Sequence, residues 1–403
     1  MTGRLRPADA AELREIVRAA LEDDEPLEIV SGATKRGLGR PPQGTPLDLA
    51  RLEGLVSYEP EELILRARAA TPMVAIESWL KQAGQNLAFE PPDLGPFYGL
   101  PADRQTIGGV IATNLSGPRR IKAGAARDHF LGFSAVNGRG EDFKAGGHVV
   151  KNVTGYDLCK LLAGSYGTLA ILTEVTLKAL PAPEDVRTLA LAGLSAADAV
   201  RAMGRAFASP FDASAAAHVP ANLAARLGGL AGQSWTFVRF EGPEQALRAA
   251  TDEVARDLAA YGAAEILDAA ASAAPWRAVR DIVPLFPSDG SCVWRASVPP
   301  ARAAEAVAAL TARLGVEWYL DWAGGRIWLR VLDEGADGGA EVGRGAVSAC
   351  GGHAVLMRGS EAIRLNTAPL DPGSAGALAL SRRIKQSFDP KALFNRGRMY
   401  DGV

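Results

Sequence analysis

Glycines at tight turns constrain this chain more than any other feature. The stretch Lys151–Leu158 continues to Gly164–Leu172. Its pattern predicts, in order, a glycine-containing loop, a short helix, a second glycine turn and an apolar strand rich in β-branched residues. Glycine has no Cβ, so the backbone can turn tightly or lie directly against a ligand at these points. Successive exposed N–H groups in such turns form a nest for an anion. The pattern predicts a phosphate-bearing ligand that the backbone holds.

Two further loops of this kind lie upstream, at Gly32–Gly39 and Thr106–Arg120. The first follows a short strand and carries a threonine and a lysine between glycines, but it fits neither the P-loop nor the Gly-x-Gly-x-x-Gly pattern of nicotinamide-binding folds. Either loop alone is also consistent with an ordinary packing turn. Three such loops within 180 residues indicate one large common ligand, which we interpret as FAD.

Composition restricts the remaining possibilities. A chain of 403 residues is longer than the chains that usually fold around a single hydrophobic core, so two domains are expected. The net charge of −2 argues against a nucleic-acid partner. Cys159, Cys292 and Cys350 form no Cys-x-x-Cys pair, which favours a reducing compartment and predicts no iron–sulfur or zinc site. No run approaches the roughly 18 apolar residues of a membrane span, so we expect a cytoplasmic protein.

Hydrophobic periodicity and turn residues divide the chain at 180–184, where two prolines follow a long apolar strand. We expect a loop-rich stretch at 101–128 and a surface loop at Gly335–Gly345. Beyond the division, alanine-rich helices alternate with aromatic strands, which favours an antiparallel sheet backed by helices. The strands expected there are Arg187–Ala192, Trp235–Glu241, Cys292–Val298, Glu317–Trp322, Arg326–Val331 and His353–Met357.

The loops carry a resemblance to a known family. Residues Ile29–Pro181 resemble the FAD-binding domain of the p-cresol methylhydroxylase / vanillyl-alcohol oxidase (PCMH-type) superfamily and, more narrowly, the FAD-binding subunit of bacterial glycolate oxidase. The stretch Phe388–Tyr400 is similar to its terminal Asp-Pro-x-x-x-Phe-Asn-x-Gly-Arg signature. The resemblance implies a two-domain α+β fold with an FAD-binding domain at 1–181, an antiparallel α+β cap domain at 182–360, and a C-terminal segment at 361–403 that packs back on the FAD domain.

The resemblance also implies which residues contact the cofactor. It assigns the first loop to the pyrophosphate, the second loop and the glycines after it to the rest of the flavin nucleotide, and Asn395 to the ring system. Ala33-Thr34 stands where members with covalent flavin have histidine, so non-covalent FAD is expected. No metal is expected, since His218 and His353 are isolated in the sequence. The implied cofactor residues are Gly32, Ala33, Thr34, Lys35, Thr106, Gly108, Gly109, Thr113, Asn114, Gly117, Gly155, Gly164, Gly167, Thr168, Ile171 and Asn395.

A 2-hydroxy acid substrate needs a cation for its carboxylate and a base for its hydroxyl proton. Arg295, Arg330 and Arg358 lie in otherwise apolar strands, and arginine can bind a carboxylate bidentately. His353 could act as a base near neutral pH. We therefore predict Arg295, Arg358 and His353 as catalytic residues, although a regular strand would place His353 and Arg358 on opposite faces. Salt-bridged structural roles for the arginines remain an open alternative.

The implied function is that of the FAD-binding subunit of a glycolate oxidase complex, which oxidises glycolate or another short 2-hydroxy acid. The implied partners are a larger homologous FAD-binding subunit and an iron–sulfur subunit, and the complex could associate peripherally with the inner face of the cell membrane. Two alternatives stay open. One is a non-catalytic FAD-binding assembly subunit, and the other is a stand-alone FAD-linked oxidoreductase for another hydroxy acid or alcohol.

Overall fold

The computed structural model describes residues 5–147, 156–228, 230, 232–286, 291–333, 335–371 and 373–403. The chain divides into two compact units. The first comprises Met1–Ser116, Gly124–Ala182 and Ala368–Val403, and the second comprises Gly117–Ala123 and Pro183–Thr367. The division after Ala182 lies one residue from the expected boundary at 181. The chain returns to the first unit at Ala368, whereas 361 was expected.

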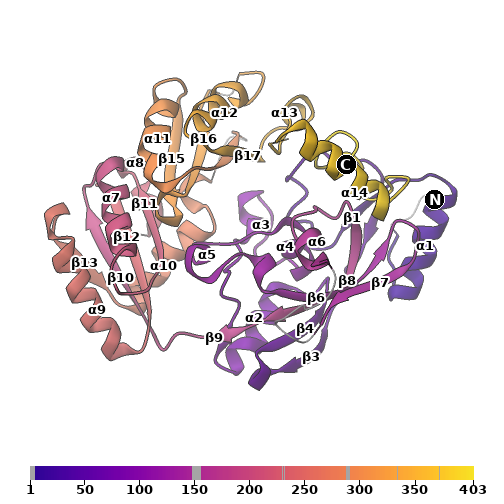
Figure 1. The fold of residues 1–403 in the computed structure, drawn as a ribbon, viewed down its shortest axis with the longest axis horizontal. Helices are drawn as coiled ribbons and strands as arrows, with labels where there is room; N and C mark the ends of the chain where they lie inside the picture. Colours follow the sequence, from indigo (N-terminus) through magenta and orange to yellow (C-terminus); the bar gives the residue numbers. More distant parts are fainter. Residues whose placement is uncertain are drawn as a thin grey trace. The chain divides into compact units, whose positions relative to one another are not determined.

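The first unit is built on antiparallel strands. Its described strands form a five-stranded sheet of order β3-β4-β8-β6-β7, a parallel pair β1-β2 and a short pair β5-β9 (Figure 1). The strands are β1 (Leu27–Val30), β2 (Thr45–Asp48), β3 (Leu55–Glu59), β4 (Ile64–Arg68), β5 (Gln85–Asn86), β6 (Phe130–Asn137), β7 (Asp142–Gly146), β8 (Ala170–Lys178) and β9 (Leu180–Pro181). The helices are α1 (Ala10–Glu22), α2 (Met73–Gln82), α3 (Leu94–Phe97), α4 (Ile107–Thr113), α6 (Leu158–Leu162) and α14 (Ala375–Phe388).

The expected N-terminal helix is present and capped as its sequence predicts. The Asp9 carboxylate accepts hydrogen bonds from the N–H groups of Ala11 and Glu12, and the Ala8 N–H donates to Glu12 Oε2 at 2.7 Å. These contacts satisfy N–H groups that the first helical turn leaves without intrahelical partners. Leu13 and Val17 are fully buried on the inner face of the helix.

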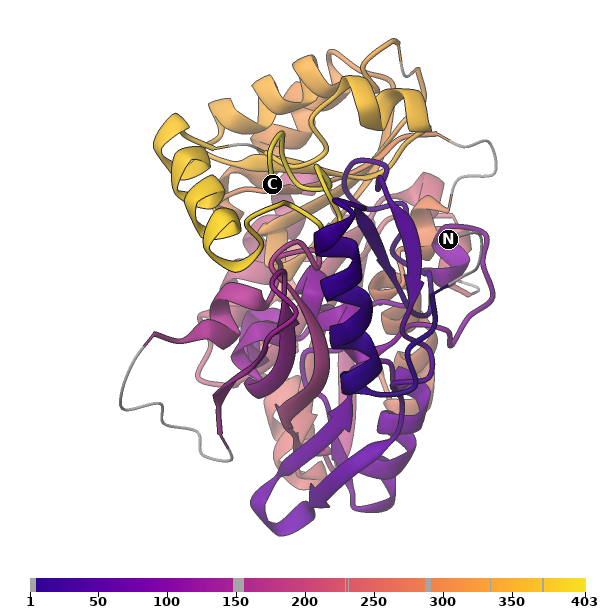
Figure 2. The same ribbon diagram turned by 90° about the vertical axis from the view of Figure 1, so that its right-hand side faces the viewer.

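The C-terminal segment returns to the first unit, as the sequence predicted. Leu27 in β1 and Phe394 form a parallel bridge, and the Leu27 N–H donates to the Leu393 carbonyl at 2.8 Å. Figure 2 shows this tail in yellow beside the indigo N-terminal strands and α1. Leu393 and Phe394 are fully buried together with Leu13 and Leu27. The last residues of the chain therefore help to form the core beneath β1.

The second unit is an antiparallel α+β layer. Its described strands form one eight-stranded sheet of order β13-β10-β12-β11-β15-β16-β14-β17. The strands are β10 (Asp185–Ala192), β11 (Ala213–Val219), β12 (Trp235–Gly242), β13 (Ala264–Leu267), β14 (Val293–Ser297), β15 (Val316–Asp321), β16 (Arg326–Val331) and β17 (His353–Arg358). The helices are α5 (Arg120–Ala123), α7 (Ala196–Phe207), α8 (Ala221–Ala224), α9 (Glu244–Asp257), α10 (Ala269–Arg280), α11 (Ala303–Thr311), α12 (Ala340–Ala349) and α13 (Glu361–Asn366).

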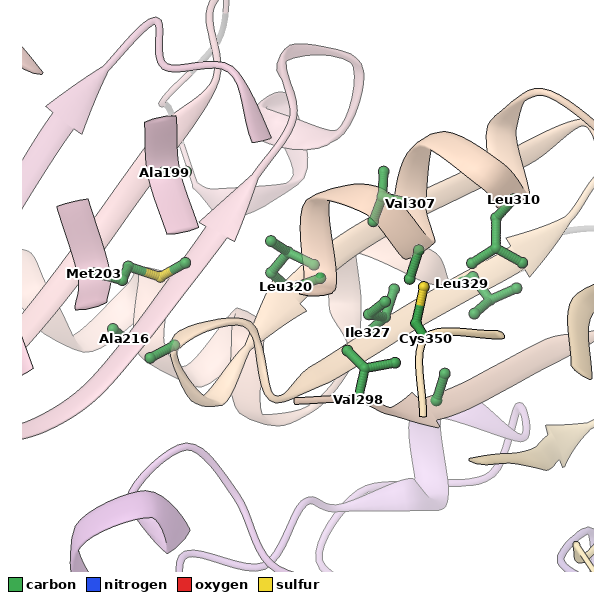
Figure 3. Packing of buried hydrophobic residues seen from close by; sticks show 14 of the residues in the cluster. Ala199, Met203, Ala216, Val298, Val307, Leu310, Leu320, Ile327, Leu329 and Cys350 are labelled. Atoms are coloured by element: carbon green, nitrogen blue, oxygen red, sulfur yellow. The ribbon is translucent and has the colours of Figure 1, made fainter. Parts of the chain in front are cut away.

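The apolar core of this unit lies on one face of the sheet. The helices α7, α9, α11 and α12 contribute small and branched side chains that pack against alternate residues of the strands, such as Leu320 and Ile327 (Figure 3). On the other face, the α10 residue Trp276 donates from Nε1 to Thr188 Oγ1 at 2.8 Å. Alternation along the strands thus separates an apolar face from a face that carries polar and charged side chains.

Two expectations about local structure were wrong. Gly335–Gly345 is not a surface loop throughout, because α12 begins at Ala340 after Gly339 adopts a left-handed φ of +76°. The Asp337 carboxylate accepts from the Gly339 and Glu341 N–H groups and so stabilises the start of this helix. The stretch 101–128 was expected to be loop-rich, but it contains α4. None of the described helices is long and apolar enough to cross a membrane.

Candidate functional site

The described parts of the three predicted glycine loops line one cavity in the first unit, whereas residues 151–155 of the third loop lie outside the described residues. The cavity has a volume of about 860 Å³, including the part that is open to solvent. Its walls come from residues 29–36 of the first loop, 106–113 of the second, 162–172 of the third, and from the C-terminal tail. We call this cavity the cofactor pocket.

The first loop leaves β1 through a left-handed turn. Ala33 has a φ of +61°, an arrangement that favours glycine and that stores strain in a residue with a side chain. Arg36 fixes the loop from outside by a bidentate contact with Glu28, with Nε–Oε1 and Nη2–Oε2 distances of 2.5 and 2.6 Å. Arg398 from the tail donates to the Lys35 carbonyl at 2.6 Å. The loop is therefore held from both sides.

The second loop lies against the backbone of the strand β4 and its extension. The Gly108 N–H donates to the Ala69 carbonyl at 2.8 Å, and a Cβ at Gly108 would lie 2.7 Å from that oxygen. Glycine is thus required by this close approach rather than by a ligand. Gly109 differs, because the atoms nearest to a Cβ there would be the Thr106 hydroxyl and the end of the Lys35 side chain, both in the pocket wall.

The third loop is bonded to the end of α4. The Tyr166 N–H donates to the Ala112 carbonyl at 2.7 Å, and the Gly164 N–H donates to the Ile111 carbonyl at 3.0 Å. Tyr166 and Gly167 both have left-handed φ values, +56° and +70°. The second and third loops are therefore one hydrogen-bonded assembly.

Asn395 joins that assembly to the first loop. Its Oδ1 accepts from the Ile29 N–H at 2.9 Å, and its Nδ2 donates to the Tyr166 carbonyl at 2.7 Å. The Asn395 N–H donates to the Leu27 carbonyl at 2.9 Å, and only 2% of the residue is exposed. One side-chain amide thus links β1 and the third loop at the wall of the pocket.

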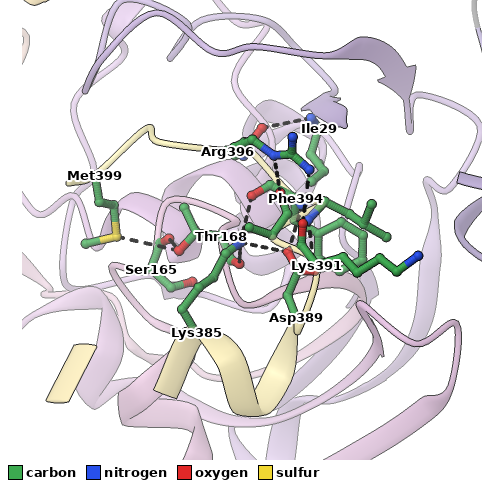
Figure 4. Close-up of polar contacts among 12 residues, drawn as sticks. Ile29, Ser165, Thr168, Lys385, Asp389, Lys391, Phe394, Arg396 and Met399 are labelled. Atoms are coloured by element: carbon green, nitrogen blue, oxygen red, sulfur yellow. Dashed lines mark hydrogen bonds and ion pairs between the residues drawn. The ribbon is translucent and has the colours of Figure 1, made fainter. Parts of the chain in front are cut away.

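A buried ion pair between Lys385 and Asp389 holds the segment that immediately precedes Asn395 (Figure 4). Lys385 Nζ donates to Asp389 Oδ2 at 2.7 Å, to the Thr168 carbonyl at 2.6 Å and to the Phe394 carbonyl at 3.0 Å. The Asp389 carboxylate in turn accepts from the N–H groups of Leu393 and Phe394. The three donors of the ammonium all have acceptors. Burial still lowers the pKa of Lys385, against the opposing effect of Asp389.

Lys35 is buried in the pocket wall with a different set of partners. Its Nζ donates to Thr34 Oγ1 at 3.3 Å and to Gln105 Oε1 at 3.2 Å, and both acceptors are neutral. Burial lowers the pKa of Lys35 from 10.5 to about 7, against a smaller opposing effect of Asp93. Nearby, Ser31 Oγ is buried without a hydrogen-bond partner among the described residues. A cation, an unsatisfied hydroxyl and the loop backbones are a donor set suited to a diphosphate.

The structure brings most of the predicted cofactor residues together in this pocket. Lining it are Gly32, Ala33, Thr34, Lys35, Thr106, Gly108, Gly109, Thr113, Gly167, Ile171 and Asn395. Asn114, Gly117, Gly164 and Thr168 are not among the lining residues, and Gly155 lies outside the described residues. Asn114 accepts from the Arg127 N–H, and Thr168 accepts from Lys385, so both hold neighbouring segments. Sequence reasoning missed Ser31, Tyr166 and Arg398.

The predicted catalytic residues lie in the second unit on the face of the sheet opposite its apolar core. Arg295 is in β14, and its neighbours Val293 and Ser297 on the same face pair with Arg358 and His353 of β17. A register shift beside Val293 turns Arg358 onto the face of Arg295 and His353, so the expectation for a regular strand does not hold. His353 and Arg358 nevertheless occupy opposite ends of β17, roughly 16 Å apart along the strand.

Two further arginines share this face, which we call the basic face (Arg295, Arg326, Arg330, Arg358 and His353). Arg326 pairs with Ser297 and lies 3.2 Å from the centre of the Trp322 ring, measured from its Cζ. Burial and, next, the charge of Arg295 lower the pKa of Arg326. Arg330 forms an ion pair with Glu317 at 2.9 Å, which supports a structural role for it. Sequence reasoning did not single out Arg326.

The histidines and cysteines are not arranged as a metal site. In the described part of the chain, no group of three or more histidine, cysteine, aspartate or glutamate side chains could hold a metal ion. His218 is buried in β11, contacts Thr236 Oγ1 through Nδ1 at 2.8 Å, and has its pKa lowered to about 4 by burial. The three cysteines are buried as free thiols, and burial raises the pKa of Cys159 to about 12.

Comparison with known proteins identifies the family to which this chain belongs. Residues 2–146 match the family model described as FAD binding domain. The chain is 34% identical to the glycolate oxidase subunit GlcE of Escherichia coli (strain K12), over 98% of this chain and 99% of that one. The chain belongs to the GlcE family. A D-lactate dehydrogenase of Anaerostipes hadrus is 33% identical, but over only 40% of this chain and 31% of the relative.

A solved structure extends the fold assignment of this GlcE family member. Substrate-bound p-cresol methylhydroxylase superposes with a TM-score of 0.71 over 99% of this chain and 88% of that one, at 14% identity. The predicted PCMH-type two-domain fold is therefore confirmed, and so is the resemblance to the glycolate oxidase FAD-binding subunit. FAD is the cofactor, and the chain is a FAD-dependent oxidoreductase. The Lys35, Ser31 and backbone donors of the pocket fit its diphosphate.

The two buried lysines should respond oppositely to substitution. Lys35→Met removes a group whose pKa is about 7 in the folded chain and 10.5 in the unfolded chain, so the unfolded state binds the proton preferentially between those values. Without FAD, we expect the variant to raise the free energy of unfolding near pH 7 by about 1–3 kcal/mol. The gain should fade as the pH rises toward 10.5. Urea unfolding of the FAD-free protein measures it.

Lys385→Met provides the contrasting variant for the same measurement. It leaves the Asp389 carboxylate buried without its cation, so we expect the free energy of unfolding to fall by about 3–5 kcal/mol. Equal effects of the two substitutions would contradict the distinction between a compensated lysine and a ligand-binding one.

Asn395→Ala should weaken both the fold and the pocket. It leaves the Ile29 N–H and the Tyr166 carbonyl buried without their partner, at a cost of about 2–4 kcal/mol in the free energy of unfolding. FAD affinity should fall as well, since both groups border the pocket. Asn222→Ala, at an exposed position of α8, serves as the control and should change the free energy of unfolding by less than about 0.5 kcal/mol. Retention of normal FAD affinity by Asn395→Ala would count against its role in the pocket.

Proposed function

We propose that this chain is the FAD-binding subunit of a glycolate oxidase complex and takes part in the oxidation of glycolate, or another short 2-hydroxy acid, to the 2-keto acid. The observation that carries the proposal is the convergence of three glycine loops on one pocket in a chain that is similar to GlcE over its whole length. The partial similarity to D-lactate dehydrogenase supports a hydroxy acid as the substrate class.

The pocket would hold FAD without a covalent bond. Ala33 and Thr34 occupy the first loop, and no histidine is among the lining residues that the structure describes. Lys35 and Ser31 would contact the diphosphate, while Gly109 would leave room for the cofactor against the backbone. Gly167 leaves room for Asn395, since a Cβ there would lie 2.8 Å from Asn395 Nδ2. The left-handed residues Ala33, Tyr166 and Asn395 would be held in place by their hydrogen bonds rather than by the ligand.

The basic face would supply the substrate contacts. When bound, FAD accepts two electrons from the carbon that carries the substrate hydroxyl. Arg295 and Arg358 lie on adjacent strands, two residues apart in register, so their guanidinium groups could hold one carboxylate together. His353 would accept the hydroxyl proton. His353 pairs with Ser297, and Arg358 pairs with Val293, so Arg295 lies between them in the sheet. Arg295 is therefore the residue that both His353 and Arg358 could approach.

The electrons would leave through a partner protein. The three cysteines are too few for an iron–sulfur cluster with four thiolate ligands, and all three are buried. We propose an iron–sulfur subunit as the acceptor and a larger homologous flavoprotein as the second partner. The complex would lie in the cytoplasm and associate peripherally with the inner face of the cell membrane.

A second candidate is a non-catalytic assembly subunit that binds FAD while the larger flavoprotein performs the chemistry. One observation favours it, namely the separation of His353 from Arg358 by the length of β17. A two-carbon acid could not contact both side chains at once unless they turned toward each other over Arg295.

Flavin reduction separates these candidates. The purified chain, loaded with FAD under anaerobic conditions, is mixed with glycolate, D-lactate or a simple alcohol, and its visible absorbance is followed. We expect glycolate to bleach the flavin of the chain alone, and Arg295→Leu to slow bleaching about tenfold or more, because a charged hydrogen bond to the carboxylate is lost. Arg248→Leu, an exposed α9 residue paired with Glu244, is the matched control and should have no effect.

The other outcomes distinguish the alternatives. Bleaching that requires the larger flavoprotein would support the assembly role, and bleaching by the alcohol alone would support a stand-alone oxidoreductase. A chain that takes up no FAD would contradict every candidate.

A further inference from the structure

Lys35 is a buried ammonium group in a wall of the cofactor pocket, and its environment lacks a compensating charge at close range. Only 7% of the residue is exposed. Its two acceptors, Thr34 Oγ1 and Gln105 Oε1, are neutral and distant for hydrogen bonds to an ammonium, at 3.3 and 3.2 Å. No carboxylate of the described residues forms an ion pair with it, although Asp93 acts on it from farther away.

The aliphatic part of the Lys35 side chain lies against the second loop. This contact fixes the position of the Nζ atom in the pocket wall. A Cβ at Gly109 would lie 3.5 Å from Lys35 Cδ and 3.9 Å from Cε, so the side chain crosses from the first loop to the start of α4. Ser31 Oγ, buried and without a partner among the described residues, lines the same cavity. A lysine with three donors and two neutral acceptors therefore has one donor left for a ligand.

The two buried lysines of this unit differ in the acceptors that surround their ammonium groups, although burial lowers the pKa of both. Lys385 donates to a carboxylate and two carbonyls, whereas Lys35 has a hydroxyl and an amide oxygen. An ammonium group that loses its hydration without gaining an anion is destabilised relative to the neutral amine. The diphosphate of FAD supplies two negative charges, which would reverse that balance.

We propose that the diphosphate of FAD enters the pocket together with one proton, which Lys35 Nζ takes up from solvent. The inference rests on FAD as the cofactor and is independent of which substrate the enzyme oxidises. Lys35 thus binds the cofactor as a cation but is a neutral amine in much of the FAD-free protein above neutral pH.

The direction of the pH dependence follows from the charges that face Lys35. Burial lowers its pKa to about 7, Asp93 opposes this weakly, and the diphosphate would raise it again. Two arginines also lie near Lys35: Arg36 forms an ion pair with Glu28, and Arg398 donates to the Lys35 carbonyl. Between about pH 7 and the raised value, binding takes up a proton, and FAD affinity falls by up to about tenfold for each pH unit.

Isothermal titration calorimetry tests the proposal directly. FAD is titrated into the FAD-free protein at several values from about pH 6 to about pH 9, each in two buffers of different ionisation enthalpy. The difference between the binding enthalpies in the two buffers gives the number of protons taken up per FAD. We expect close to one proton per FAD near pH 8 and almost none near pH 6. ADP, which shares the diphosphate, should also take up a proton, and riboflavin, which lacks it, should not.

Two variants make the result decisive. Lys35→Arg keeps a permanent charge, so FAD should bind without proton uptake across the whole range. Lys35→Met removes the charge, so FAD should bind weakly and without uptake, while circular dichroism verifies the fold. Proton uptake that persists in either variant, or its absence from the unmodified protein at every pH, would overturn the proposal.

Discussion

The side-chain amide of Asn395 is the contact on which the cofactor pocket depends. It connects the Ile29 N–H to the Tyr166 carbonyl, two groups 137 positions apart in the numbering of the chain. It is a direct hydrogen-bonded link between β1, from which the first loop leaves, and the third loop. The Lys385–Asp389 pair holds the tail in the position from which Asn395 can bond both. The last residues of the chain therefore complete a site that its first half only outlines.

The pocket also contains features that work against stability. Ala33, Tyr166 and Asn395 adopt left-handed φ values that cost of order 1 kcal/mol or more each in residues other than glycine. Lys35 and Ser31 Oγ add buried polar groups with incomplete hydrogen bonding. Strain and unsatisfied polarity gathered in one cavity indicate a site that is arranged for a ligand, since a purely structural interior would avoid both. Binding of FAD would recover part of this free energy.

Much of the fold could be predicted because its signals are local. Glycine turns identified the three loops, and the alternation of apolar residues identified strands such as β8 and β16. The strand β11 was missed because its run of alanines is buried on both faces and shows no alternation, and its only branched residue is Val219 at its end. Arg398 was missed because its role in the pocket arises from a contact with the Lys35 carbonyl, far away in the sequence. Ser31 was missed because the sequence does not show that its hydroxyl is buried in the pocket wall. The face of Arg358 depends on a β-bulge, which the sequence of β17 does not reveal.

The central claim is that three loops and the C-terminal tail hold one FAD. Amide hydrogen exchange, measured by mass spectrometry with and without FAD, tests it across the whole chain. The account predicts that FAD slows exchange together in residues 29–36, 106–113, 162–172 and 393–398, while the outer strand β13 is unchanged. Slower exchange confined to one of these segments, or concentrated in the second unit, would contradict a pocket built by their convergence.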